Sequence, residues 1–464
     1  MRDNFIFLVI AICFVLALMS RVAGLYTYWW FAIFRPHDWV WGSLISDLRL
    51  PLVAALLLVI PSAIQKIYPK INHPIAVLML LMLGSLITAD LINGCSTAPI
   101  VRTADIAALF VLFFVVLLTI EIVDDKKKLF WLIAVISISL AFHSAKGGIN
   151  AMLTGASYYG FNNLSGLFSG SNAFALGSGM LLFFMIFTFQ FINSYLVYEN
   201  KNKWYSSPLA LKIYKAAFII IIIGSFYNIV ALESRGSFIS TSAGLFLWIL
   251  LHKYRIRMLI ITTVLISVGL SVAPMPEGYE DRIASAFAEE EERDSSAASR
   301  PHFWDVAKNM VATYPEGVGP GCYPAYYNIF DHSNGLYGHY RSVHSSHFQI
   351  LADAGYFGVC IWVLLFLVSY WKLYKIKKRA NSLVQDEDSK QFYINIANMM
   401  TCTISVFIAG GSFYEYGYND IIWLVFALVI AAEKVMNSEI DAKPDAKTSL
   451  QPKKNRLKRR FKQS

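Results

Sequence analysis

Two histidines stand three residues apart in the segment RSVHSSHFQILADAGYFGV, at positions 344 and 347, directly before a long apolar run. Neutral imidazole, with an ordinary pKa of about 6.5, can act as a general base near neutral pH. If a helix begins early in this segment, His347 lies on the same face as His344. On position alone, His344 is more readily a capping or interfacial residue, while for His347 packing and a supporting role are equally plausible. We take His344 as the candidate base, and His347 and Arg341 as candidate supporting residues.

Arginines form the second group of residues that could do chemistry. Arg235 follows Glu233 in ALESRGSFIS (231–240), at the end of an apolar segment, and a guanidinium at membrane depth normally faces a polar cavity or a partner. Its planar fork of five donors suits phosphate oxygens. Arg282 and Arg300 lie in a later polar segment. Singly, each arginine is explained by an ion pair, such as Arg235 with Glu233; together they predict an anion-binding clamp.

The composition of the chain is that of a polytopic membrane protein. Of its 464 residues, 56% are hydrophobic and 15% charged, whereas a soluble domain carries about a quarter charged residues. Its mean hydropathy is +0.50. A membrane-spanning helix needs about 20 mostly apolar residues, so we expect an all-α fold with about 12 or 13 transmembrane helices, the second segment being short enough to be re-entrant. The apolar segments are 5–19, 22–34, 44–64, 74–89, 103–123, 129–145, 173–197, 209–232, 237–251, 258–273, 347–370, 394–412 and 421–432.

Clusters of lysine and arginine predict the orientation of these helices, since such residues collect on the cytoplasmic side. Clusters near positions 124, 199, 252 and 372 and in the C-terminal tail fit alternating spans. The tail is therefore a topology signal near anionic lipid rather than a nucleic-acid site. We expect N-terminal transmembrane helices in 1–273, a large outer loop in 274–346, C-terminal transmembrane helices in 347–435 and a basic cytoplasmic tail in 436–464.

The large outer loop is too long to be a plain connector, and such loops are usually functional. It contains RPHFWDVAKNMVATYP (300–315), whose apolar residues recur at helical spacing. This pattern predicts a short amphipathic helix that could lie on the membrane surface.

Cysteines and cofactor motifs add little chemistry. The five cysteines show no CxxC or Cys/His metal spacing. Cys95 and Cys322 both fall on the expected outer side, where a disulfide could form, and the sequence leaves that bond open. No Walker loop, HExxH, GxSxG or dinucleotide fingerprint is present, and GVGPG at 317–321 predicts a turn. We expect no cofactor and no metal ion, and a transferase of this kind would not use a nucleotide-sugar donor inside the cell.

Several motifs together resemble the O-antigen ligase and polymerase superfamily. They are SRGSFIS (234–240), GVGPGCYPAYY (317–327) and HSSHFQILADAGYFGV (344–359), in that order around a large outer loop. The chain is more closely similar to the exosortase-A-associated O-glycosylation ligases, and the resemblance covers about residues 1–362. The motifs of this closer similarity are MRDNFIFLVI (1–10), RPHDWVWG (35–42), KGGINAMLTG (146–155), GSNAFALGSGM (170–180), MPEGYEDRIAS (275–285) and SSAASRPHFW (295–304).

The resemblance implies a GT-C-like glycosyltransferase in the bacterial inner membrane, with its outer loop and active site facing the periplasm. Such an enzyme takes an oligosaccharide from undecaprenyl diphosphate and passes it, without metal, to a hydroxyl of lipid A core or of a protein. Family roles fall on Arg235 and on Arg282 or Arg300, which would hold the diphosphate, and on His344, which would be essential. Direct attack with His344 as base would invert the anomeric centre.

Three departures from the family pattern concern the acceptor more than the donor. Ser345 stands where the family often has asparagine, His347 where an aromatic residue is common, and Ser171 precedes Asn172 where two asparagines are usual. Asn172 and Glu233 are therefore expected only as supporting residues of the site.

Two other functions stay open. A polymerase of the same superfamily would use the same donor chemistry with a glycan as acceptor. A transporter of lipid-linked oligosaccharide would line a path with the same arginines, but transporters often show inverted repeats, and no internal repeat is found here. We expect a polyprenyl-linked donor and a lipid or protein acceptor as partners, and no nucleic acid. The sequence names neither the sugar nor the oligomeric state.

Overall fold

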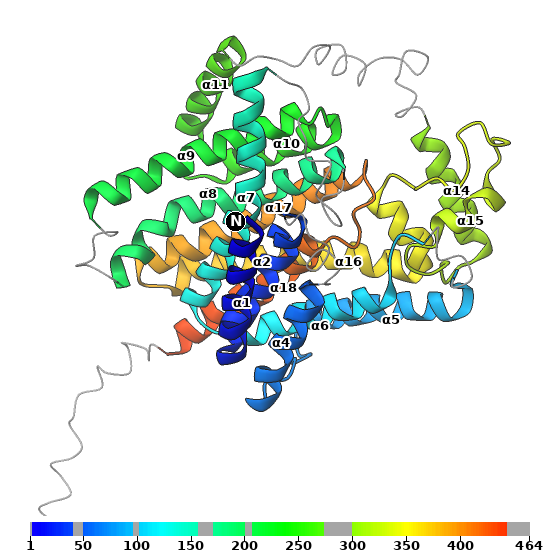
Figure 1. Ribbon diagram of the computed structural model, residues 1–464, viewed down its shortest axis with the longest axis horizontal. Coiled ribbons are helices and arrows are strands. Elements are labelled where there is room, and N and C mark those ends of the chain that lie inside the picture. Colours follow the sequence, from blue (N-terminus) through cyan, green and yellow to red (C-terminus); the bar gives the residue numbers. More distant parts are fainter. Residues whose placement is uncertain are drawn as a thin grey trace, which may run out of the picture.

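Helices dominate the computed structural model, which describes residues 2–39, 50–95, 102–155, 170–199, 207–272 and 299–442 and shows no strand in these ranges (Figure 1). The helices are α1 (Arg2–Met19), α2 (Arg21–Phe34), the short 3-10 helix η1 (Pro36–Trp39), α4 (Leu50–Ile64), α5 (Pro74–Asn93), α6 (Ile106–Ile122), α7 (Lys126–Thr154), α8 (Ser171–Glu199), α9 (Pro208–Ala231), α10 (Arg235–Leu251), α11 (Arg255–Val272), α14 (Arg300–Thr313), α15 (Tyr323–Phe330), α16 (Ser346–Leu383), α17 (Glu387–Gly411) and α18 (Asp420–Asp441).

Each apolar segment expected from the sequence coincides with one of these helices. Within the described ranges, 7 helices are long and apolar enough to cross a membrane, namely α5, α7, α8, α9, α16, α17 and α18. The apolar helices α1, α4, α6 and α10 are shorter. The chain is an all-α polytopic membrane protein, and the count of 12 or 13 crossings stays a prediction.

Small residues let α8, α10 and α17 approach one another closely. A methyl group added at Gly179 of α8 would overlap Thr241 of α10, and one added at Gly410 of α17 would overlap Leu176 of α8. Membrane helices associate through such small-residue contacts because lipid provides no hydrophobic driving force between them. The outer ends of the three helices are thereby brought together.

A second apolar cluster lies outside this bundle, at one end of the long axis in Figure 1. Here α14 and α15 pack on each other and on the first turns of α16. The helix expected at the membrane surface does form, as α14, but its apolar face is buried against protein. The expectation of a surface-lying helix was wrong because the aromatic residues of α15 and the start of α16 cover that face. The buried residues of the cluster are Cys95, Phe303, Val306, Ala307, Met310, Val318, Cys322, Tyr323, Tyr327, Val343 and Ala352.

The segment 317–322, GVGPGC, ties this outer cluster to the bundle, and we call it the strap. Gly317, Gly319 and Gly321 have φ of +93°, +92° and +70°, a region that favours glycine. The strap lies against α16, where the Gly319 N–H donates to the Asp353 carbonyl at 3.0 Å and the Gly321 N–H donates to Asp353 Oδ2 at 2.8 Å. The predicted turn at GVGPG is confirmed, and its glycines serve close backbone packing.

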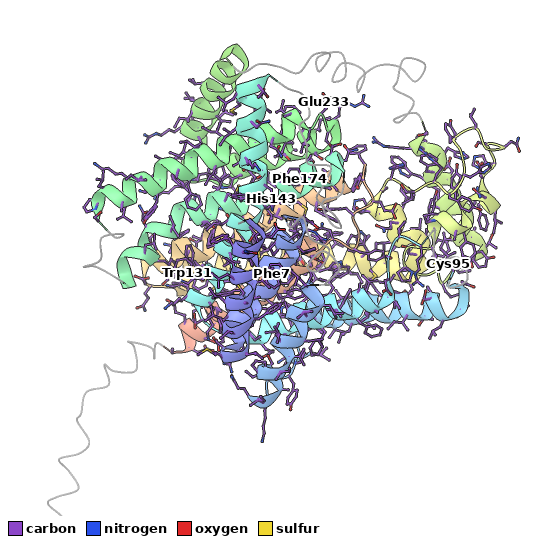
Figure 2. All side chains as sticks on the ribbon, viewed as in Figure 1. Phe7, Cys95, Trp131, His143, Phe174 and Glu233 are labelled. Carbon is purple, nitrogen blue, oxygen red and sulfur yellow. A yellow bond between two sulfur atoms is a disulfide. The ribbon has the colours of Figure 1, made fainter. Side chains whose placement is uncertain are left out.

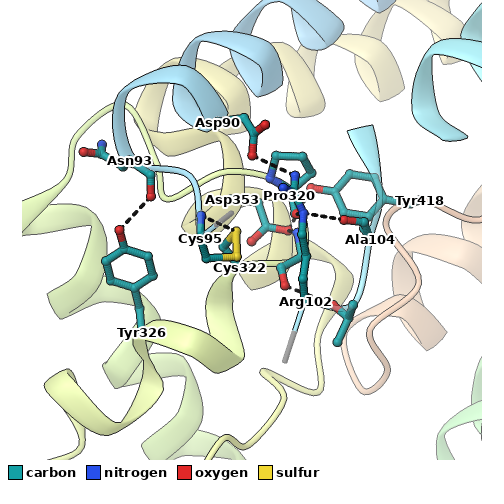
Figure 3. Close-up of a disulfide and its surroundings, with 12 residues drawn as sticks. Asp90, Asn93, Cys95, Arg102, Ala104, Pro320, Cys322, Tyr326, Asp353 and Tyr418 are labelled. Carbon is teal, nitrogen blue, oxygen red and sulfur yellow. Dashed lines mark hydrogen bonds and ion pairs between the residues drawn. A yellow bond between two sulfur atoms is a disulfide. The ribbon is translucent and has the colours of Figure 1, made fainter. Parts of the chain in front are cut away.

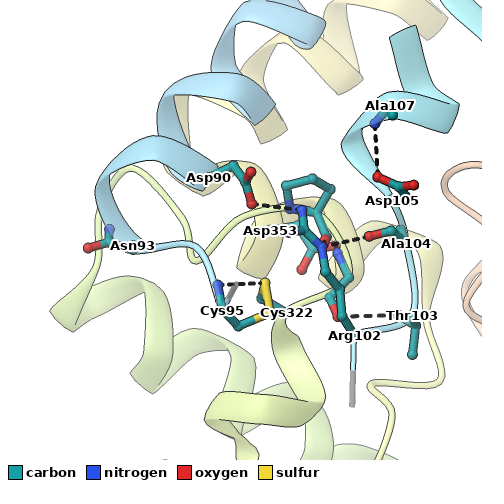
Figure 4. A network of polar contacts seen from close by, with 12 residues as sticks. Asp90, Asn93, Cys95, Arg102, Thr103, Ala104, Asp105, Ala107, Cys322 and Asp353 are labelled. Carbon is teal, nitrogen blue, oxygen red and sulfur yellow. Dashed lines mark hydrogen bonds and ion pairs between the residues drawn. A yellow bond between two sulfur atoms is a disulfide. The ribbon is translucent and has the colours of Figure 1, made fainter. Parts of the chain in front are cut away.

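A disulfide closes the strap onto the end of α5. Cys95, just beyond α5, is bonded to Cys322 across 227 residues of sequence, as Figure 3 shows, and Figure 2 places Cys95 at the far end of α5. Beside it, Arg102 donates to Asp90 Oδ1 at 2.7 Å and to the Pro320 carbonyl at 3.2 Å (Figure 4). The bond that the sequence left open is thus formed, within a polar network that holds both chain segments.

The helix α16 is broken near its start. Gly355 has φ of 68° and ψ of −167° inside the helix, and the Tyr356 N–H donates to the Pro315 carbonyl at 3.0 Å. The segment expected to span from 347 to 370 is therefore two pieces. The piece before Gly355 belongs to the outer cluster and carries His347 and Asp353.

Charged residues of α16 and α18 are paired at the helix ends that lie far from the strap. Lys372 and His73 contact Glu433 Oε2 at 2.8 and 2.9 Å, and Lys434 donates to the Ile120 carbonyl at the end of α6 at 2.8 Å. These groups line a cavity of about 360 Å³. Their pairing offsets the cost of charge near the membrane.

The disulfide determines how many cysteines can be alkylated before and after reduction. Alkylation of the unfolded, unreduced protein should label only Cys13, Cys360 and Cys402, and reduction should add two further labels in the mass spectrum. Cys322→Ser should expose Cys95 and lower stability by about 2–4 kcal/mol, a typical value for a native disulfide. Cys360→Ser, at an exposed free cysteine, is the control and should leave the bond intact. Labelling of all cysteines without reduction would contradict the pairing.

Candidate active site

A cavity of about 120 Å³ lies where the outer ends of α8, α10 and α17 meet the start of α14. Four residues singled out by sequence line it together: Asn172, Glu233, Arg235 and Arg300. The other lining residues are Ser234, Gly236, Ser237, Gly410, Phe413 and Tyr414. Arg282, the remaining predicted clamp residue, lies outside the described ranges.

Three helices begin at this cavity. The helix α8 starts at Ser171, next to Asn172, while α10 starts with Arg235 and α14 with Arg300. The first N–H groups of a helix have no partner within it, and the helix dipole is positive at this end, so helix N-termini bind anions. Ser234 precedes α10 but donates to Ser237 Oγ at 2.9 Å and does not cap the first turn. These helix ends, with Arg235 and Arg300, bring positive charge to the cavity, while Glu233 and the C-terminal end of α17 at Gly410 bring negative charge to its lining.

A tight turn between α9 and α10 positions the first arginine. Glu233 has φ of 53°, and its N–H donates to the Val230 carbonyl at 2.9 Å; Figure 2 marks Glu233 at this turn. Gly236 follows Arg235, and a methyl group there would lie 3.2 Å from Phe413. The guanidinium of Arg300 lies 5.8 Å from the centre of the same Phe413 ring. Phe413 thus links the two arginine-bearing turns.

His344 is not among the residues that line the cavity; it is half-buried in the loop before α16, near enough to Arg300 for their charges to interact. Its ring centre is 5.6 Å from that of Phe303, and its Nε2 is 3.4 Å from Ser342 Oγ. Burial, together with the positive charges of Arg300 and Arg341, lowers the pKa of His344 to about 4. The imidazole is thus neutral at physiological pH, with a pKa below the ordinary value assumed from the sequence.

Residues 216–363 match a family model described as O-antigen ligase. This part of the chain therefore carries an O-antigen ligase domain. The match runs from α9 into α16 and contains Arg235, Arg300 and His344, whereas Asn172 lies before it. A search of the curated proteins finds no match.

The second histidine of this O-antigen ligase domain is held by packing contacts. Trp362 Nε1 donates to His347 Nδ1 at 3.1 Å, and His347 Nε2 lies 3.0 Å from the Ile408 carbonyl. An indole N–H can only donate, so Nδ1 is the acceptor and Nε2 carries the proton. Both nitrogens are occupied, which favours the packing interpretation of His347 over a role in proton transfer.

Arg341 is a second positive charge near His344. It is exposed, and its guanidinium is 5.6 Å from the centre of the Phe303 ring. The His344 ring packs near the same phenyl ring, so both side chains lie beside Phe303.

The segment 412–419, between α17 and α18, contributes residues that the sequence did not single out. Phe413 and Tyr414 line the cavity, and Ser346 of α16 donates to the Tyr414 carbonyl at 2.8 Å. The side chain of the next residue, Glu415, accepts hydrogen bonds from Gln349 Nε2 at 3.1 Å and from Thr103 Oγ1 at 3.5 Å. The sequence signal for this segment is the stretch SFYEYGYN (412–419), which places aromatic residues and a glutamate at a helix end. The family resemblance covers only about residues 1–362, so it did not point to this stretch.

Anion binding in the cavity should raise the pKa of His344. Without ligand the imidazole should protonate near pH 4, because burial and then the charges of Arg300 and Arg341 oppose a positive charge on it. Pyrophosphate would offset the arginine charges but not the burial, and would move the pKa part of the way back toward its ordinary value of about 6.5. The measurement is a ¹⁵N-histidine NMR titration in detergent micelles, with the His344 signal assigned by its loss in His344→Asn.

Two variants sharpen this titration. Arg300→Gln should raise the pKa of His344 without pyrophosphate, whereas Arg255→Gln, at an exposed arginine of α11, should leave it unchanged. A His344 signal that does not respond to saturating pyrophosphate would separate the histidine from the anion site.

Proposed function

We propose that this protein is a glycan ligase that transfers an oligosaccharide from undecaprenyl diphosphate to an acceptor hydroxyl of lipid A core or of a protein. One observation carries the proposal: Arg235 and Arg300 meet at the N-termini of three helices on one cavity, with a neutral histidine near Arg300. The O-antigen ligase domain supports glycan transfer as the chemistry. In the proposal Arg282 joins the clamp.

The donor diphosphate is the group that suits the cavity. At about 120 Å³ it is smaller than the roughly 300–1,000 Å³ of typical small-molecule sites, so it fits a diphosphate rather than a whole glycan. Guanidinium forks and helix N-termini are fixed donors, and such donors stabilise charge that develops on a leaving group. Glu233 and Asn172, on the same wall, offer polar groups to an incoming hydroxyl.

His344 takes the proton of the acceptor in this proposal. The acceptor oxygen bonds to the anomeric carbon as the bond from that carbon to the diphosphate oxygen breaks. The electron pair leaves with undecaprenyl diphosphate, the proton moves to His344, and the anomeric centre is inverted without a metal ion. A bound diphosphate also offsets the charges of Arg300 and Arg341, so donor binding would make His344 a stronger base.

The periplasmic face of the inner membrane is the proposed location. Disulfides persist in oxidising compartments, and the Cys95–Cys322 bond lies on the same side of the helices as the arginine cavity. Lysines gather at the opposite helix ends, as at the start of α7, which fits the positive-inside rule.

A polymerase of the same superfamily is the second candidate, because the donor site would be identical. The deciding experiment reconstitutes the protein in liposomes with a labelled undecaprenyl-diphosphate glycan. Lipid A core, a periplasmic protein extract or a second lipid-linked glycan is then supplied as acceptor. Transfer of the label to lipid A core or to a periplasmic protein supports the ligase. Transfer only to the second lipid-linked glycan supports the polymerase.

The donor clamp predicts the effect of a charge-conserving change. Arg235→Lys should lower kcat/KM by about 10²-fold or more, because a point charge cannot reproduce two parallel hydrogen bonds to phosphate oxygens. Arg255→Lys, at an exposed arginine of α11, is the matched control and should transfer normally. Full transfer by a well-expressed Arg235→Lys protein would exclude bidentate binding by this residue.

The base assignment predicts a contrast among three histidines. His344→Ala should lose transfer by about 10²- to 10⁴-fold, the usual contribution of a general base, while the donor still binds. His347→Ala should chiefly lower the melting temperature, since it removes the contacts to Trp362 and Ile408. His339→Ala, at an exposed histidine of the same loop, should change neither. Near-normal transfer by His344→Ala would leave arginine electrostatics as the main source of catalysis.

A further inference from the structure

We propose that the cavity of about 360 Å³ at the helix ends far from the strap binds the phosphate headgroup of an anionic phospholipid. This cavity shares no lining residue with the arginine cavity, and the inference does not depend on the proposed transfer reaction. Its walls come from the segment before α5 and from α6, α16 and α18. The charged and titratable lining residues are Lys70, His73, Glu121, Lys372, Glu433 and Lys434.

The side chains of the cavity carry an excess of positive charge. Three lysines and two glutamates line it, which leaves a formal charge of +1 when His73 is neutral. The Ile75 N–H donates to His73 Nδ1 at 3.2 Å, and His73 Nε2 lies 2.9 Å from Glu433 Oε2. A neutral ring with its proton on Nε2 satisfies both contacts. One phosphodiester, with its single negative charge, would therefore balance the site.

The lysines differ in how fully their N–H donors are used. Lys372 donates to both carboxylate oxygens of Glu433, at 3.1 and 2.8 Å, and Lys434 donates to a backbone carbonyl of α6 at 2.8 Å. Among the described residues, Lys70 has only an ion pair of 4.0 Å with Glu121, and its side chain is 72% exposed. That distance is too long for a hydrogen bond. Lys70 can therefore donate to an incoming phosphate without giving up a hydrogen bond.

The size and the uncharged polar groups of the cavity suit a headgroup with hydroxyls. The volume of about 360 Å³ falls within the roughly 300–1,000 Å³ of small-molecule sites, which leaves room for a phosphate and a glycerol. Asn437 also lines the cavity, and its buried side-chain oxygen accepts no hydrogen bond from the described residues. A buried acceptor without a donor costs free energy, and a hydroxyl of phosphatidylglycerol would supply that donor.

The surface beside the cavity favours a lipid over a soluble anion. Exposed apolar and aromatic side chains stand three or four residues apart along α16, namely Leu364, Leu367, Trp371 and Tyr374. This spacing places them on one face of the helix. Lys372 Nζ lies 5.5 Å from the centre of the Trp371 ring, so the apolar face reaches the cavity. A phospholipid with its phosphate in the cavity could lay its acyl chains on this face.

The position of the cavity along the helices fits a membrane surface. The helix α5 begins at the cavity and ends next to Cys95, and α16 packs beside it (Figure 1). Tryptophan and tyrosine, which flank Lys372 at positions 371 and 374, are enriched where a membrane meets water. In the orientation proposed above this end faces the cytoplasm, where basic pockets between helices bind anionic headgroups.

The test measures phospholipid binding to the full-length protein in detergent by native mass spectrometry. The apparent Kd for dioleoyl phosphatidylglycerol should be lower than that for dioleoyl phosphatidylcholine by about 5-fold or more, the factor that one lysine contributes near an anionic surface. Soluble glycerol 3-phosphate carries the same phosphate without acyl chains. At equal concentration it should not displace phosphatidylglycerol.

Substitutions that change the charge of the cavity but hardly its shape should act in opposite directions. Glu121→Gln removes the carboxylate that Lys70 and Lys434 share and should strengthen phosphatidylglycerol binding by about 5-fold. Asn437→Asp adds a carboxylate and should weaken binding by about the same factor, as should Lys70→Gln. Lys378→Gln is the matched control, because Lys378 is an exposed lysine of α16 outside the cavity, and it should leave binding unchanged.

Each alternative result would overturn a defined part of the inference. Equal affinity for phosphatidylcholine would show that the acyl chains alone determine binding. Displacement by an equal concentration of glycerol 3-phosphate would exclude a lipid as the occupant. Unchanged binding by Lys70→Gln, or weaker binding by a Glu121→Gln protein with a normal melting temperature, would exclude this cavity as the site. Since Lys70 is largely exposed, its variant should fold even if a substitution deeper in the cavity does not.

Discussion

The attachment of the strap to three parts of the chain is the constraint on which the site depends. The Cys95–Cys322 bond joins it to the end of α5, and Asp353 accepts its backbone N–H groups from α16. The strap lies directly between α14 and α15 in the chain. A side chain at Gly317 would overlap the backbone of Asp353, and one at Gly321 would overlap Ala104, so the strap packs closely on both neighbours. It thereby restrains α14, which precedes it in the chain, relative to α16.

Close helix packing sets the other half of the site. Glycines bring α8, α10 and α17 together, so the N-termini of α8 and α10 converge on one small cavity, which the start of α14 completes. The proposed anion site therefore depends on several elements rather than on one residue. The arginines supply charge and geometry, the helix ends supply fixed N–H donors, and Phe413 holds both arginine-bearing turns against the 412–419 segment.

The sequence predicted those features that depend on local pattern. Apolar runs located the helices, the glycines of GVGPG indicated a turn, and residue type identified Arg235, Arg300 and His344. Features that depend on tertiary contacts were missed. The break at Gly355 lies within a continuous apolar pattern, and the apolar face of α14 has the same spacing whether lipid or protein covers it. Glu415 lies in a stretch that the family resemblance did not cover, and its contacts with Gln349 and Thr103 join segments distant in sequence.

The arginines have two opposing effects in the proposed site: they attract an anion, and they disfavour protonation of His344. Burial and the charges of Arg300 and Arg341 lower the pKa of His344, which makes the imidazole a weak base. In the proposed function the charge of Arg300 also attracts the donor diphosphate. A bound diphosphate would offset that charge and make His344 a stronger base without any movement of the backbone. The proposed donor site and the proposed base would therefore be coupled by electrostatics, and this coupling would favour binding of the donor before the acceptor.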